Sequence, residues 1–228
     1  MEIAFLGDSI TYGYSLPNPE VERWSYLVSK ELHVREKKLG ICGTLMARAN
    51  MNRLPDDRSF VERVDLMKGA DCGIIFGGTN DYFWTDSPIE APENTREADP
   101  LVYFRPAVSY ILDRAVAMFG KEKTLLITPY SHHGWGNFRH GDNANTPRFH
   151  DTDAPNYCGY CLEDYCDILK EEAETRGILL LDLFSIYGRH SAGFDWQKLT
   201  FDGCHPNTEG HQLIADHVLK AVSSWRQG

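Results

Sequence analysis

The sequence predicts an α/β protein built around a parallel sheet. Short apolar runs alternate with longer stretches that carry apolar residues at helical spacing, which is typical of parallel strands joined by helices. Glycine-bearing turns follow several of the apolar runs. The 228 residues show no internal repeat and no shift in composition, so we expect one domain over residues 1–228 with one substantial core.

About five strands are expected, and residues 71–76 among them form a continuous apolar run, as in a parallel strand that is buried on both faces. The first ends at Gly7, and the third is closed by Gly77 and Gly78. The fourth is stopped by Pro129, which cannot donate to a strand ladder. In chain order the expected strands are residues 2–6, a segment ending near residues 39–41, and residues 71–76, 124–128 and 178–183.

Amphipathic helices are expected between and after these strands. Residues 158–176 are followed by Gly177, a residue suited to the left-handed conformation that ends many helices. The expected helices are residues 22–32, 101–119, 158–176 and 207–225. Two polar segments, residues 82–100 and 130–157, are expected to be long loops, which are often lids or binding loops.

The charge and hydropathy of the chain exclude several classes of partner. The net charge of −10 disfavours nucleic acids and anionic membrane surfaces. No apolar stretch approaches the ~18 residues of a membrane span, and Gly7 and Asp8 interrupt any signal-peptide core. We therefore expect a cytoplasmic protein that binds neither nucleic acid nor membranes, whereas a homo-oligomeric state stays open.

Polar residues gather directly after predicted strands and before the last helix. Parallel strands end at one edge of the sheet, which is where open α/β sheets bind ligands. The four segments are Gly7-Asp8-Ser9, Gly40-Ile41-Cys42-Gly43-Thr44, Gly77-Gly78-Thr79-Asn80-Asp81 and Phe201-Asp202-Gly203-Cys204-His205-Pro206.

Together these segments contain the groups that ester hydrolysis requires. Ser9 is the candidate nucleophile, His205 the base that takes its proton, and Asp202 the acid that orients the base. The backbone N–H groups of Ser9 and Gly43 and the side-chain amide of Asn80 are candidate donors to the oxyanion. Taken alone, Ser9 is better explained as a helix cap and Asn80 as a turn residue. Their occurrence together favours the catalytic interpretation.

The same segments resemble the blocks of the SGNH (GDSL-type) hydrolase superfamily, in that family's order, from residue 7 to about residue 217. The resemblance implies a three-layer α/β/α fold with a five-stranded parallel sheet in flavodoxin-like order. It also implies hydrolysis of esters or thioesters with no metal and no other cofactor. The second block departs from the family at Lys38 and Cys42, so Gly40 remains an alternative to Gly43.

Side chains near the strand ends indicate the kind of substrate. Tyr82, Trp84 and Trp135 are candidate substrate contacts, and Asp8 is either another contact or a structural acid of its turn. Asp81 is expected to anchor its loop by hydrogen bonds.

The acidic composition and polar loop favour a small acyl ester, such as an acetylated carbohydrate, over a lipid. A thioesterase or lysophospholipase on the same fold, and a catalytically silent carbohydrate-binding relative, stay open as alternatives.

Cysteines and histidines raise the alternative of a metal or redox site. Cys158 and Cys161 form a CxxC pair with Cys166 nearby, but no second pair lies at a zinc-binding spacing. We expect partly buried thiols there. No metal ion is expected in the second long loop either, because its histidines match no standard ligand spacing. They are His132, His133, His140 and His150.

Overall fold

The sheet is parallel and five-stranded, with the order β2-β1-β3-β4-β5, so the expected flavodoxin-like order is confirmed. The computed structural model describes residues 1–48, 58–84, 88–91, 99–132, 155–156, 158–187 and 196–227. The strands are β1 (Glu2–Gly7), β2 (Arg35–Gly40), β3 (Cys72–Phe76), β4 (Thr124–Ile127) and β5 (Leu179–Leu181).

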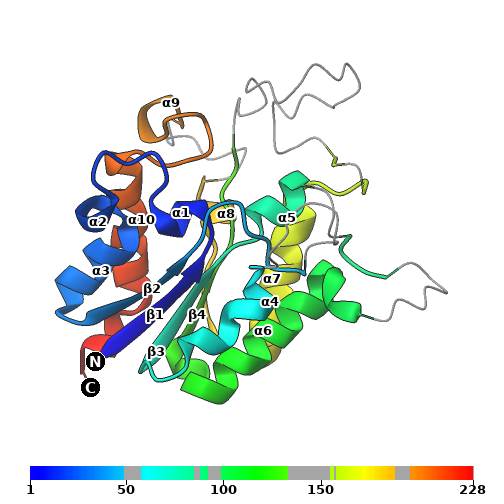
Figure 1. Ribbon diagram of the computed structural model, residues 1–228, viewed down its shortest axis with the longest axis horizontal. Helices are drawn as coiled ribbons and strands as arrows, with labels where there is room; N and C mark the ends of the chain where they lie inside the picture. Colours follow the sequence, from blue (N-terminus) through cyan, green and yellow to red (C-terminus); the bar gives the residue numbers. More distant parts are fainter. Residues whose placement is uncertain are drawn as a thin grey trace.

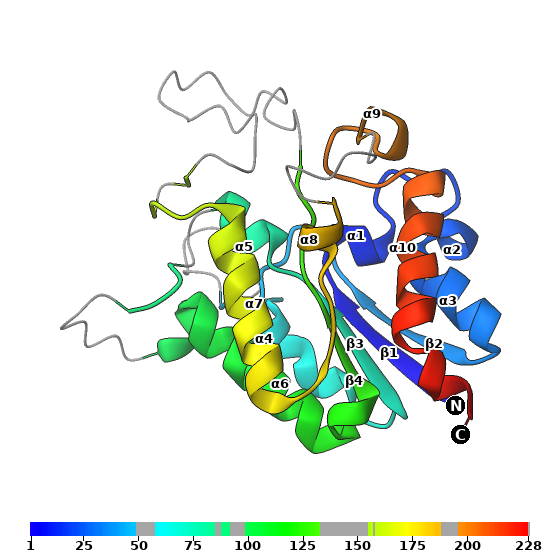
Figure 2. The ribbon, with the colours of Figure 1, turned by 180° about the vertical axis from the view of Figure 1, so that it is seen from behind.

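Helices cover both faces of the sheet and so form the outer layers (Figures 1 and 2). One face carries α2 (Pro19–Glu22), α3 (Trp24–Leu32) and α10 (Thr208–Ala221). The other carries α4 (Phe60–Arg63), α6 (Phe104–Phe119) and α7 (Leu162–Arg176). Shorter helices follow the carboxyl ends of strands or connect elements. They are α1 (Ser9–Tyr12), α5 (Thr79–Trp84), α8 (Leu183–Tyr187) and α9 (Trp196–Leu199), with the 3₁₀ helices η1 (Val64–Met67), η2 (Pro100–Val102), η3 (Lys121–Lys123) and η5 (Ser223–Gln227).

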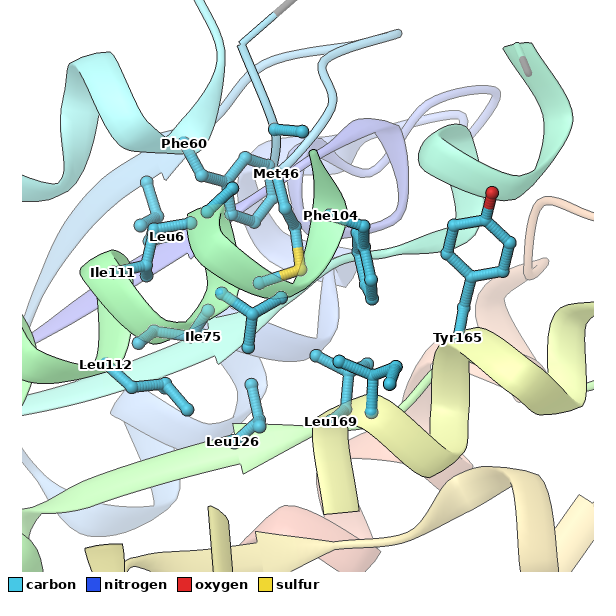
Figure 3. Packing of buried hydrophobic residues seen from close by; sticks show 14 of the residues in the cluster. Leu6, Met46, Phe60, Ile75, Phe104, Ile111, Leu112, Leu126, Tyr165 and Leu169 are labelled. Atoms are coloured by element: carbon cyan, nitrogen blue, oxygen red, sulfur yellow. The ribbon is translucent and has the colours of Figure 1, made fainter. Parts of the chain in front are cut away.

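The central strands are buried on both faces, which explains their continuous apolar sequences. Successive side chains of a strand point to opposite faces. In β1, Phe5 packs in the cluster beneath α3 and α10, whereas Leu6 packs in the cluster beneath α4, α6 and α7. Figure 3 shows Leu6, Ile75 and Leu126 of three neighbouring strands in this second cluster. A rigid sheet with two packed faces therefore supports the turns at its carboxyl edge.

Helix α7 begins later than the expected helix, at Leu162 instead of residue 158. The carboxylate of Asp164 accepts a hydrogen bond of 2.7 Å from the backbone N–H of Cys161 and caps the helix there. The expected end is confirmed, because Gly177 adopts the left-handed conformation with φ 62°.

Other boundaries differ from the expected ones where short helices replace loops or ends. The expected loop over residues 82–100 starts inside α5, which continues to Trp84, and η2 begins at Pro100. The expected C-terminal helix ends at Ala221 and is followed by the separate 3₁₀ helix η5. Most of the other expected long loop, residues 130–157, lies outside the described residues.

No helix in the described part of the chain has both the length and the apolar character needed to cross a membrane. All six cysteines lie within the described ranges, and no disulfide joins them. Cys158 and Cys161 are partly exposed and Cys166 is buried, in agreement with the expected partly buried thiols. Among the described residues, no group of three or more histidine, cysteine or acidic side chains is placed to hold a metal ion.

Candidate active site

Ser9 begins α1 immediately after β1. The cap of this helix is Asp8, whose Oδ1 accepts a hydrogen bond of 2.9 Å from the backbone N–H of Ile10. Ser9 itself is therefore not the cap. The strand can turn this sharply because Gly7 has no side chain, since a Cβ there would lie 2.0 Å from Oγ1 of Thr11. The turn holds the Ser9 hydroxyl at the carboxyl edge of the sheet.

Asp202 organises the loop that carries His205. Its Oδ1 accepts hydrogen bonds from the backbone N–H groups of Cys204 (2.9 Å) and His205 (2.7 Å). Its Oδ2 lies 2.7 Å from the ring Nδ1 of His205. The loop turns at Gly203, with φ 85°, and the hydroxyl of Tyr130 donates a bond of 2.6 Å to the carbonyl of Cys204. One carboxylate thus shapes the backbone and orients the imidazole.

The structure brings Ser9, His205 and Asp202 into one hydrogen-bonded chain. Nε2 of His205 lies 3.1 Å from Oγ of Ser9, across a separation of 196 residues. With the proton on Nδ1, the ring donates to Asp202 and can accept the proton of the serine hydroxyl at Nε2. Both residues are shielded from water, with 9% of Ser9 and 8% of His205 exposed. The geometry suits a nucleophile paired with a base.

Asp202 is held in its ionised form. Burial opposes ionisation, but the hydrogen bonds from the ring and backbone of His205 outweigh it, and the pKa of Asp202 falls to about 2. The carboxylate is therefore available at neutral pH to stabilise a positive charge on the imidazole.

Asn80 lies in the first turn of α5, after β3, and is buried beside the turn that carries Ser9. Its Nδ2 donates hydrogen bonds of 3.0 Å to the carbonyl of Thr44 and 3.3 Å to Oδ2 of Asp8. The amide nitrogen has two hydrogens, and these two bonds use both of them. Asn80 can therefore donate to a substrate oxygen only if one bond, such as the longer one to Asp8, is replaced.

The two glycines proposed as oxyanion donors have different surroundings. A Cβ on Gly40 would lie 2.6 Å from the backbone nitrogen of Tyr12, so Gly40 lets α1 pack closely on the end of β2. Gly43 has φ 73° and open space on the side where a Cβ would lie. Gly40 is therefore needed for the close packing of α1, whereas no atom packs against the Cβ position of Gly43.

Asp81 anchors the loop after β2 and not its own loop, which corrects the expectation. Its two carboxylate oxygens accept hydrogen bonds from the backbone N–H groups of Met46 (2.9 Å) and Ala47 (3.0 Å). Asp81 is fully buried, and burial raises its pKa to about 7 despite these two bonds. The acid thereby ties the end of β3 to the loop that contains Gly43.

Two of the four predicted substrate contacts do not face solvent. Asp8 is buried as a helix cap and partner of Asn80, and this burial raises its pKa to about 6. Tyr82 has no exposed surface and packs its ring against Phe83 and Tyr165. Asp8 is thus a structural acid of its turn, as the alternative expectation had it, and Tyr82 offers no exposed surface for the predicted contact. The side chain of Trp84 and all of Trp135 lie outside the described residues.

Arg63 is a residue that the sequence motifs did not indicate. Its guanidinium is buried and donates to the carbonyls of Gly7 (3.2 Å) and Leu39, at the ends of β1 and β2, and to the hydroxyl of Thr44 (3.0 Å). Burial lowers the pKa of Arg63 to about 10, so it stays positively charged at neutral pH. Nothing in the local sequence around Arg63 distinguishes it from a surface arginine on a short helix.

Tyr14 is a second residue that the motifs missed. Its ring lies against the imidazole of His205, with a centroid distance of 4.7 Å and an interplanar angle of 54°. The signal that could have indicated Tyr14 is its position five residues after Ser9. Because α1 ends at Tyr12, the chain turns back toward the site at this point.

Comparisons with known proteins agree with this architecture. The sequence model of the GDSL-like lipase/acylhydrolase family matches residues 5–213. No curated protein matches the sequence.

Among solved structures, a Lactobacillus plantarum protein is 22% identical with a TM-score of 0.74, covering 98% of this chain and 96% of its own. An alpha/beta hydrolase enzyme from the metagenome of Lake Arreo, Spain, is 21% identical with a TM-score of 0.64, covering 97% and 94%. A catalytic mutant of an acetylxylan esterase from Geobacillus stearothermophilus is 16% identical with a TM-score of 0.64, covering 97% and 93%. At these identities the likeness shows a shared fold.

Proposed function

The chain belongs to the GDSL-like lipase/acylhydrolase family, and from this premise we propose that it is a serine ester hydrolase acting through an acyl-enzyme. The observation that carries the proposal is the hydrogen-bonded chain from Asp202 through His205 to Ser9, with distances of 2.7 and 3.1 Å. A nucleophile, a base and an orienting acid within hydrogen-bond reach are the arrangement that acyl transfer requires.

In the proposed reaction, Oγ of Ser9 attacks the ester carbonyl while Nε2 of His205 takes the hydroxyl proton. Asp202 keeps the imidazole oriented and stabilises its charged form. The backbone N–H groups of Ser9 and Gly43, with the amide of Asn80, donate to the tetrahedral oxyanion. His205 then gives the proton to the leaving alcohol. A water molecule next loses a proton to the same ring and attacks the acyl carbon, and the acid is released as the bond to Oγ breaks and Ser9 regains its proton.

We propose a small acyl group, such as acetyl on a carbohydrate, as the substrate class. The acidic chain, with a net charge of −10, disfavours anionic lipid surfaces. One protein of the same fold is described as an acetylxylan esterase. A thioesterase or lysophospholipase remains the alternative on this fold, and the length of acyl chain accepted separates these substrate classes.

The test combines active-site labelling with a panel of p-nitrophenyl esters from acetate to decanoate. A fluorophosphonate is expected to label the wild type and Ser29→Ala, which changes a buried serine of α3, but not Ser9→Ala. Ser9→Ala is expected to lower hydrolysis by about 10⁴-fold or more. Failure of the folded wild type to react with any ester and with the label would overturn the proposal. Activity on long chains alone would reject the small acyl group and favour the alternative.

A further inference from the structure

Exposed aromatic side chains gather on the two segments that carry the proposed triad. Tyr12 (52% exposed) and Tyr14 (48%) follow Ser9, and Phe201 (48%) directly precedes Asp202. Figure 1 shows the turn after α1 and the loop between α9 and α10 at the same end of the sheet. Single exposed apolar residues are ordinary, so the one that contacts the proposed triad, Tyr14, carries the argument.

Tyr14 is the member of this group whose position is best defined. Its backbone N–H donates a hydrogen bond of 3.0 Å to the carbonyl of Ser9, so the tyrosine is tied to the nucleophile's own residue. Its neighbours Gly13 (φ 83°) and Ser15 (φ 69°) both adopt the left-handed conformation. This tight turn folds the chain back over α1 and lays the Tyr14 ring against His205.

The direction of proton transfer places the alcohol part of an ester beside the imidazole of His205, against which the Tyr14 ring lies. The leaving oxygen must receive its proton from Nε2 of His205, so it lies within hydrogen-bond reach of this atom when the C–O bond breaks. The group attached to the leaving oxygen therefore extends over the His205 side of Ser9. The Tyr14 ring lies against the imidazole of His205 and keeps about half of its surface open to solvent.

We propose that Tyr14 forms the aromatic wall of the alcohol subsite and selects alcohols that present a flat apolar ring face. The proposal rests on the esterase function proposed above and adds the class of the leaving group. The Tyr14 ring can stack on a ring of the alcohol, whereas an open chain offers it less contact. The ring is thus a specificity-determining contact, and it carries no proton in the reaction.

Acyl transfer to an alcohol uses the same subsite in reverse. The oxygen of a second alcohol bonds to the acyl carbon while His205 takes its proton, and the bond from that carbon to Oγ of Ser9 then breaks as His205 gives the proton to Oγ. Hydrolysis of the same acyl-enzyme requires only water in place of the alcohol. A ring alcohol is therefore expected to compete with water for the acetyl-enzyme through Tyr14. Loss of the ring should therefore lower the share of the acetyl-enzyme that a ring alcohol captures in competition with water.

The experiment keeps the acetyl group constant and changes the alcohol. Benzyl acetate and n-pentyl acetate have leaving groups of similar size, one with a ring and one without. The variants are Tyr14→Ala, the conservative Tyr14→Phe, and the control Tyr110→Ala, which removes an exposed tyrosine of α6. The readouts are kcat/KM for both esters and the partition of the acetyl-enzyme between water and benzyl alcohol.

We expect the wild type to prefer benzyl acetate and Tyr14→Ala to reduce that preference by about two- to tenfold, the size of an aromatic contact. Tyr14→Phe should keep the preference, and Tyr110→Ala should behave as the wild type. Equal losses on both esters, or no ring preference in the active wild type, would overturn the role of Tyr14 while leaving the esterase function intact. A wild type that hydrolyses neither this pair nor the p-nitrophenyl esters would instead overturn both proposals.

Discussion

Arg63 donates a buried hydrogen bond of 3.0 Å from its Nη2 to the hydroxyl oxygen of Thr44. The same hydroxyl donates 2.8 Å to the carbonyl of Ile41, and the carbonyl of Thr44 accepts from Asn80. Thr44 is thus held through its side chain by Arg63 and through its backbone by Asn80. Because Gly43 precedes Thr44, these contacts fix the position of a proposed oxyanion donor.

Arg63→Met is expected to lower both catalysis and stability. The substitution removes the Arg63 donor from oxygens of Gly7, Leu39 and Thr44, although the Gly7 carbonyl keeps a hydrogen bond from the backbone N–H of Ile41. Each buried oxygen left unsatisfied costs about 1–3 kcal/mol. The loop with Gly43 should loosen, and kcat should fall by about tenfold or more while KM changes less. Steady-state kinetics and urea unfolding measure the two effects.

The control for Arg63 is Arg176→Met at the C-terminal end of α7. Arg176 is also largely buried and donates to Asp113, Glu172 and Ser109. This variant should lose stability but retain kcat. If both variants reduce kcat equally, or neither does, Arg63 has no specific part in positioning the loop.

Asn80→Ala is expected to reduce kcat by about 10²- to 10³-fold, the usual cost of removing one oxyanion donor. The loss should fall on kcat more than on KM, because the donor is needed most when the oxyanion forms. The matched control is Asn156→Ala, since the amide of Asn156 is also buried and donates to the carbonyl of Tyr82 and the hydroxyl of Tyr165. Unchanged kcat in folded Asn80→Ala would contradict the donor role.

Alanine at either of the two glycines after β2 should destabilise the protein, but for different reasons and with different effects on activity. Gly40→Ala places a methyl against the backbone of α1, so we expect a loss of about 1–3 kcal/mol in unfolding free energy and a displaced Ser9 with lower kcat. Gly43→Ala meets no atoms and costs about 1–2 kcal/mol, because its left-handed conformation disfavours a Cβ. Its N–H remains, so activity should persist. Thermal melts and kinetics that show the reverse order would contradict these roles.

His211 should make the folded protein sensitive to acid. Its Nδ1 accepts a hydrogen bond of 3.1 Å from the backbone N–H of Trp24. Burial above all, and then the proximity of His205 and Arg23, lowers its pKa from 6.5 to about 3. Only the unfolded chain binds a proton here between these values. The stability from neutral His211 is therefore complete above pH ~6.5 and is lost as the pH falls toward 3.

The variant His211→Asn keeps an acceptor for Trp24 but cannot titrate. Its unfolding free energy should therefore decline less than that of the wild type between pH 6.5 and 3, which urea unfolding at several pH values measures. The raised pKa values of Asp8 and Asp81 increase the unfolding free energy as the pH falls from about 7 to 4. Because both proteins share this contribution, the difference between their two curves reports on His211. Parallel curves would show that His211 does not titrate as expected.

The strands and the outer helices could be predicted from the sequence because their signals are local. A continuous apolar run predicts a strand buried on both faces, and β1, β3 and β4 lie within one residue of the predicted limits. The start of α7 was predicted too early. The helix begins where the carboxylate of Asp164 accepts from the backbone N–H of Cys161, and apolar periodicity does not reveal this capping contact.

The sequence by itself determined the parallel α/β fold and the residues that could meet at its edge, because strand ends are marked by glycine and short polar residues. Only the tertiary structure decided which of them meet. Packing brings His205 to Ser9 across 196 residues and Arg63 to the end of β1 across 56. It also encloses Asp8 and Tyr82 and exposes Tyr14. The physical reason is that burial and hydrogen-bond partners arise when helices pack on the sheet, and no local periodicity encodes those contacts.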